Sequence, residues 1–223
     1  FIVFEIVSFS VIFIQTALMM GLSYYFDAEG VSYLYCYLAM FVGILLGMYL
    51  WMKPLAGWGI KNEVVFMCAV FCAGLLVMLL LGHYTFAGVI GFFCSGIGFS
   101  GGMFLIPMMN GDVIDYDEHI SGLRREGMYA GVNSFITKPA ISIANAIFPV
   151  MLLWFGYDKN IALNAQTATA KFGIRFSWLF WSVVLLTLCV IFIKKLYPLD
   201  GADWDKTKNE LAVKHEEKQK AYE

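Results

Sequence analysis

The sequence predicts an all-α membrane protein with six transmembrane helices. Of its 223 residues, 60% are hydrophobic and only 14% are charged, whereas a soluble domain has about 45–50% apolar and about 25% charged residues. The apolar residues form six long runs, each close to or beyond the ~20 residues that a helix needs to cross a hydrocarbon core ~30 Å thick. The runs are continuous rather than alternating, which favours helices over membrane strands.

The six predicted spans follow one another through short connections. They cover residues 1–26, 32–52, 64–82, 85–109, 128–155 and 174–193. The charged residues before Asn110 lie at Glu5, Asp27, Glu29, Lys53, Lys61 and Glu63. Three pairs of glycines at a spacing of four predict close contacts between helices. These pairs are Gly43 and Gly47, Gly98 and Gly102, and Gly127 and Gly131.

The basic residues that flank the spans predict the orientation. Six lie on one side, at Lys53, Lys61, Arg124, Arg125, Lys194 and Lys195, and three on the other, at Lys159, Lys171 and Arg175. This bias predicts a multi-pass protein of the cell membrane with both termini in the cytoplasm. Because Phe1 leads almost directly into a span, we interpret the chain as a carboxy-terminal fragment of a longer protein.

The chain divides into two parts. Residues 1–199 are predicted to form one six-helix bundle in the lipid bilayer, and residues 200–223 form a charged cytoplasmic tail. Lys206, Glu210 and Lys214 are spaced by four and would support a short exposed helix. We expect a partly ordered extension here rather than a docking element.

Several classes of protein are excluded by what the sequence lacks. It has no phosphate-binding or dinucleotide fingerprint and no basic–aromatic patch for nucleic acid. Cys68 and Cys72 share a helix face without a histidine or carboxylate nearby, so we predict no metal site and no cofactor. No nucleophile is paired with a base, which argues against an enzyme.

Lys138 lies in the middle of the fifth predicted span. A lysine at the centre of a spanning helix costs about 2.5–3.5 kcal/mol on insertion scales, so it is retained mostly where it faces water or a partner. Helical spacing places it within one polar stripe, formed by Gly131, Ser134, Lys138, Ser142 and Asn145. Two interpretations stay open: a transport pathway, and a polar helix–helix seam in which Lys138 bonds a neighbour's carboxylate. Gln15 in the first span likewise suits either a substrate cavity or a bond between helices.

The densest cluster of charges, which we call the acid–arginine segment (residues 110–129), connects the fourth and fifth spans. Its charged side chains are Asp112, Asp115, Asp117, Glu118, Arg124, Arg125 and Glu126. Their spacing does not fit a calcium-binding loop, and crowding into one segment does not fit an intramembrane aspartyl protease. We interpret the segment either as a solvated, ion-paired loop or as a cytoplasmic gate whose acids and arginines exchange partners.

This region resembles a known transporter family. The residues Asp112-x-x-Asp115-Tyr-Asp-Glu, then Gly122-x-Arg-Arg-Glu-Gly-x-Tyr129 and Val132-Asn-Ser-Phe-Ile-Thr-Lys138 are similar to those of the glycoside–pentoside–hexuronide:cation symporters. This melibiose-permease-like branch belongs to the major facilitator superfamily. The resemblance implies that the chain is the carboxy-terminal half of a twelve-helix fold and that its partner is a missing amino-terminal six-helix half.

The resemblance also implies a function. Such symporters alternate access and couple uptake of a sugar or glycoside to a cation, so a coupling ion, Na⁺ or H⁺, is expected. Lys138 falls where the family has a lysine near the cation site, and Asn133 and Ser134 match a pair facing the sugar cavity. Pro139 and Asn133 depart from the family's usual residues. A transporter of a lysolipid or an anionic metabolite, or a structural six-helix subunit, remains as an alternative.

Overall fold

The computed structural model describes residues 1–29, 33–52 and 58–222. Within these ranges the chain forms seven α-helices and a short 3₁₀ turn, without a strand. The helices are α1 (Ile2–Glu29), α2 (Tyr33–Met52), α3 (Ile60–Leu81), α4 (Thr85–Ser121), α5 (Glu126–Trp154), α6 (Ala168–Leu196) and α7 (Ala202–Tyr222). The first six are long and apolar enough to cross a membrane. An all-α fold with six spans is therefore confirmed.

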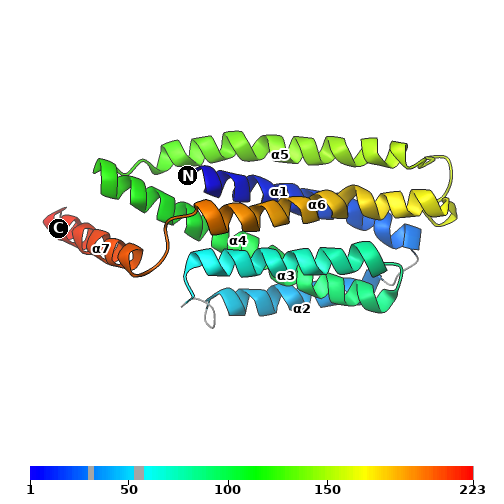
Figure 1. Cartoon of the computed structure of the whole chain (residues 1–223), viewed down its shortest axis with the longest axis horizontal. Helices are drawn as coiled ribbons and strands as arrows, with labels where there is room; N and C mark the ends of the chain where they lie inside the picture. Colours follow the sequence, from blue (N-terminus) through cyan, green and yellow to red (C-terminus); the bar gives the residue numbers. More distant parts are fainter. Residues whose placement is uncertain (30–32, 53–57, 223) are drawn as a thin grey trace.

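The six spans lie side by side in an elongated bundle, and α7 lies beyond one end of it (Figure 1). Helix α4 packs against α2 and α3, and α1 packs against α5 and α6, while α3 also contacts α6. The interior is filled by large side chains that are fully buried, such as Phe4, Phe71, Phe92 and Trp178. The core is therefore shared by α1, α3, α4 and α6.

Small residues allow α2, α3 and α4 to approach closely. A Cβ atom at Gly43 would collide with the backbone oxygen of Phe93 on α4, and one at Gly98 would collide with the side chain of Phe71 on α3. The predicted close contacts are thus confirmed for the first two glycine pairs. The third pair makes no such contact within the described residues, because nothing outside the neighbouring backbone of α5 lies within 4 Å of a Cβ placed at Gly127 or Gly131.

Helix α4 is longer than the sequence suggested. It has 37 residues, about 55 Å at 1.5 Å per residue, which exceeds a hydrocarbon core of ~30 Å. It ends only at Gly122, whose backbone has φ 71° and whose amide donates to the carbonyl of Glu118 over 2.8 Å. The four acids of the acid–arginine segment that precede Gly122 are therefore helical, and the expectation that they lie in a loop is corrected. Only residues 122–125 connect α4 to α5.

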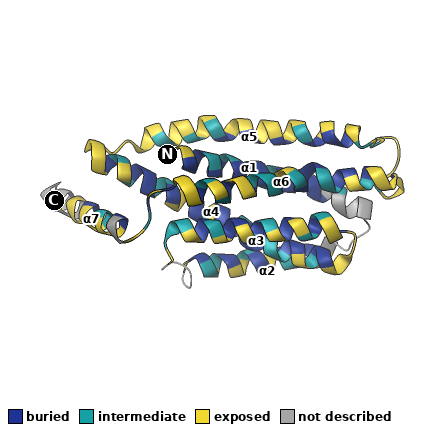
Figure 2. Cartoon of the chain, in the orientation of Figure 1, coloured by how far each residue is buried: buried dark blue, intermediate teal, exposed yellow. Residues whose placement is uncertain are grey.

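Helix α5 forms one edge of the bundle. Its buried residues, among them Thr137, Ala140, Ala144 and Phe148, repeat at helical spacing and face the rest of the bundle. The remainder of its surface is largely exposed along its whole length (Figure 2). Pro139 and Pro149 lie within the helix, where each lacks an amide proton and so cannot complete the backbone ladder.

The tail helix α7 contacts the end of α4. Trp204 and Leu211 are only 7% and 4% exposed, and the Trp204 ring meets that of Tyr116 on α4 edge to face, with centroids 5.9 Å apart. Helix α7 thus carries an apolar face that contacts α4, while the assignment of residues 200–223 to a cytoplasmic tail stays a prediction.

Candidate transport face and gate

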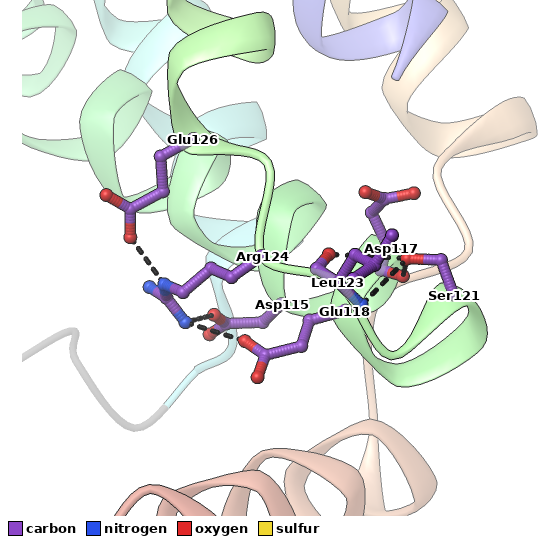
Figure 3. A network of polar contacts seen from close by, with 7 residues as sticks. All are labelled: Asp115, Asp117, Glu118, Ser121, Leu123, Arg124 and Glu126. Atoms are coloured by element: carbon purple, nitrogen blue, oxygen red, sulfur yellow. Dashed lines mark hydrogen bonds and ion pairs between the residues drawn. The ribbon is translucent and has the colours of Figure 1, made fainter.

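Arg124 holds the carboxyl-terminal end of α4 to the start of α5. Its Nη1 atom lies 3.1 Å from Oδ1 of Asp115 and 3.0 Å from Oε2 of Glu118, and its Nε atom bonds Glu126 (Figure 3). Asp115 and Glu118 are separated by three residues, so helical geometry places them on the same side of α4. One guanidinium therefore bridges three carboxylates from two helices.

Arg125 makes a separate pair with Asp117. Its Nε atom donates to Oδ2 of Asp117 over 2.8 Å, and its Nη2 atom bonds the other oxygen, which is the two-pronged arrangement that suits arginine and carboxylate. The hydrogen bond with Asp117 raises the pKa of the Arg125 guanidinium, and the bond with Glu126 likewise raises that of Arg124. Both arginines stay charged at any physiological pH.

Asp112 does not join the arginines. It is 7% exposed, and its Oδ1 atom lies 2.7 Å from the Nζ atom of Lys208 on α7. Lys208 was not singled out from the sequence. A signal was available, since Trp204, Lys208 and Leu211 are spaced by four and three and so share one helical face.

Most of the polar stripe of α5 is exposed. Ser134, Lys138, Ser142 and Asn145 all lie on the surface of the chain. In the part of the chain that the structure describes, Lys138 has no ion-pair partner. A seam that joins Lys138 to a carboxylate is therefore absent from the described residues.

Asn133 and Gln15 lie nearer the bundle. Ser8 on α1 donates a hydrogen bond to Oδ1 of Asn133 over 3.0 Å, and Thr137 donates to its backbone oxygen over 2.7 Å. Gln15 is half-buried on α1 beside Gly102 of α4. The structure thus brings Asn133 to α1, while the predicted cavity residues Ser134, Ser142 and Asn145 face outward. Over the described ranges, no group of three acidic, histidine or cysteine side chains is arranged to hold a metal ion.

The chain is similar to a known protein family and to a known transporter. The family model described as "MFS/sugar transport protein", where MFS stands for major facilitator superfamily, matches residues 1–201. An isoprimeverose transporter of Lactiplantibacillus pentosus is 33% identical over 113 residues, which cover 48% of this chain and 22% of that transporter. The match therefore spans about a fifth of the relative's length. With six span-length helices among the described residues and a family match that covers all six, this multi-pass membrane chain belongs to the MFS/sugar transport protein family.

Proposed function

We propose that the chain is the carboxy-terminal half of a cation-coupled sugar transporter that works by alternating access. The observation that carries the proposal is the polar face of α5, on which Lys138 is exposed and unpaired within the described residues. A charged side chain on a spanning helix is retained where it faces a water-filled cavity or a partner rather than lipid. The family match supports a sugar as the substrate class.

We infer that this face lines a path shared with a second six-helix half. Hydroxyl and amide groups suit the hydroxyls of a sugar, and Ser134, Ser142 and Asn145 offer them along one stripe. Lys138 would act by its charge: its ammonium competes with Na⁺ or H⁺ for carboxylates of the other half. This role corresponds to that of a glycoside–pentoside–hexuronide:cation symporter, which is the finer assignment we propose within the family.

The acid–arginine segment would be the cytoplasmic gate of this transporter. It stands at the end of the bundle from which α7 extends (Figure 1), and the positive-inside bias supports a cytoplasmic location for that end and for both termini in a cell-membrane protein. Its ion pairs hold α4 to α5, and a network of several such pairs can bias an equilibrium between states that differ by a few kcal/mol.

A second substrate class is favoured by one feature. The unpaired ammonium of Lys138 would also attract a carboxylate or phosphate, as a lysolipid or an anionic metabolite carries. A purely structural six-helix subunit is less well supported, since it leaves the exposed Lys138 without a function. An uptake assay separates the two transport proposals by showing whether neutral sugars or anionic compounds compete with the transported substrate.

Uptake into vesicles tests the proposal. Na⁺ and H⁺ gradients are imposed separately on the protein, with a panel of glycosides and pentosides. We expect gradient-driven accumulation of at least one sugar, and its loss in Lys138→Ala while passive equilibration of the sugar remains. Lys159→Ala, which removes an exposed lysine from the connection after α5, is the matched control. Gradient coupling that survives in Lys138→Ala would refute the proposal.

A further inference from the structure

The tail helix α7 contacts the helix that carries the acids of the gate. Trp204 packs edge to face on Tyr116, and Lys208 reaches Asp112 while its Nζ atom lies 5.6 Å from the centre of the Trp204 ring. A buried aromatic, a cation over its face and an ion pair therefore converge within one turn of α7. Both of the α4 residues belong to the acid–arginine segment.

A polar cavity of ≈300 Å³ lies beneath this contact, between α3, α4 and α7. Four acidic side chains line it, at Glu63, Asp112, Asp200 and Asp205. Lys208 is the sole basic residue among the described residues of the lining. Glu63 is 2% exposed, and its Oε2 atom has no hydrogen-bond partner within the described chain. Within this cavity Lys208 is thus the cation that pairs with the buried Asp112.

Withdrawal of Lys208 would leave Asp112 buried and unpaired, which is unfavourable for a carboxylate. Another cation is nearby in the chain, because Arg124 already contacts Asp115 and Glu118, which lie three and six residues beyond Asp112 on the same helix. Asp112 and Asp115 are one turn apart. An Asp112 released by Lys208 would therefore compete with Asp115 for Arg124.

We propose that Lys208 is a positioning residue of the gate: by pairing with Asp112, α7 keeps this acid away from Arg124 and stabilises the arrangement in which Arg124 bridges Asp115, Glu118 and Glu126. The inference rests on the proposed function in that it assigns a role to the gate. Docking of α7 is then coupled to the state of the connection between α4 and α5. Release of the tail loosens that connection by drawing Arg124 toward Asp112.

Hydrogen–deuterium exchange of the protein in a membrane tests the proposal without sugar or an ion gradient, so its failure is distinguishable from failure of the transport proposal. Two peptides are followed, one from α7 (residues 204–214) and one from the gate connection (residues 119–130). We expect Lys208→Met to speed exchange in both, by about tenfold in α7, as loss of one charged hydrogen bond predicts. Lys208→Arg, which keeps the pair, should restore slow exchange, and Lys214→Met, in an exposed position of the same helix, should change neither peptide.

An Arg124→Gln background tests whether Lys208 acts on the gate connection through Arg124. There, Lys208→Met should still speed exchange in α7 but should cause no further change in the gate connection. A purely structural role for Lys208 predicts the same change in the gate connection with or without Arg124, and that result would overturn the proposal. So would a gate connection unaffected by Lys208→Met, or equal effects of Lys208→Met and Lys214→Met on α7.

Discussion

The acid–arginine segment and the polar face of α5 are both rich in polar groups, yet they are satisfied in different ways. In the segment, each arginine pairs with acids of the same chain, and Arg124 alone contacts three. On α5, Ser134, Lys138, Ser142 and Asn145 point away from the bundle that positions them. The first region is built to hold two helices together, whereas the second is built to meet something outside the described bundle.

Loss of a charge should therefore lower stability in the acid–arginine segment but not on the polar face of α5. The largest effect on transport is expected for Lys138→Leu. We expect cation-driven uptake to fall by two orders of magnitude or more, while stability is unchanged, because Lys138 is exposed and has no ion-pair partner among the described residues. Uptake and thermal unfolding in detergent would be measured on the same preparation. A protein that loses stability together with transport would place Lys138 in a structural seam.

Arg124→Gln should have the next largest effect, and in contrast to Lys138→Leu it should lower stability. It removes the guanidinium that contacts Asp115 and the buried Glu118, at a cost of about 1–3 kcal/mol. We expect a shift of about tenfold in the balance between inward- and outward-facing states, with sugar binding retained. State-dependent thiol labelling near the gate measures the shift. An unchanged balance would mean that the ion pairs do not act as a gate.

Asn133→Ala should give a smaller effect that separates the two sides of α5. It removes the acceptor of the Ser8 hydroxyl, a loss of about 0.5–1.5 kcal/mol of stability. The neighbouring Ser134→Ala, on the exposed side, should leave stability unchanged and weaken sugar affinity by a few-fold. Thermal unfolding and sugar binding on both variants measure the difference. If Ser134→Ala lowered stability and left sugar affinity unchanged, the assignment of Ser134 to the sugar-facing side of α5 would be wrong.

The pair of Arg125 and Asp117 should show the smallest effect. Arg125 is 42% exposed, and exposed pairs contribute about 0–1 kcal/mol and are screened by salt. Arg125→Gln should change the state balance less than Arg124→Gln, and the difference from wild type should shrink in high salt. An effect equal to that of Arg124→Gln at all salt concentrations would contradict this ranking.

The spans could be predicted because hydropathy and length alone determine them. The extension of α4 could not be predicted from hydropathy, because the acids that continue the helix beyond the membrane are the same residues that a solvated loop would use. Gly122 was the available signal: a helix commonly ends at a glycine in the left-handed conformation, which other residues rarely adopt.

The polar stripe was predicted from its spacing, and the structure places most of it on one exposed face of α5. The partition of the acids between Arg124, Arg125 and Lys208 was not accessible from the sequence. Asp112 and Lys208 are far apart along the chain, and only the fold of α7 against α4 brings them together. Assignment of the coupling cation and the sugar remains a prediction.

The central claim, that the polar face of α5 lines an aqueous sugar pathway, is tested most directly by a pair of cysteines at one depth. Ser142→Cys lies on the polar stripe, and Ile143→Cys is the next residue, also exposed but rotated by about 100°. With the five native cysteines replaced, both variants are treated with a water-soluble, membrane-impermeant thiol reagent. Our account predicts that Ser142→Cys reacts and is protected by the transported sugar, while Ile143→Cys, facing lipid, does not react. Equal reactivity at both positions, or no reaction at Ser142→Cys in any state of the transporter, would contradict it.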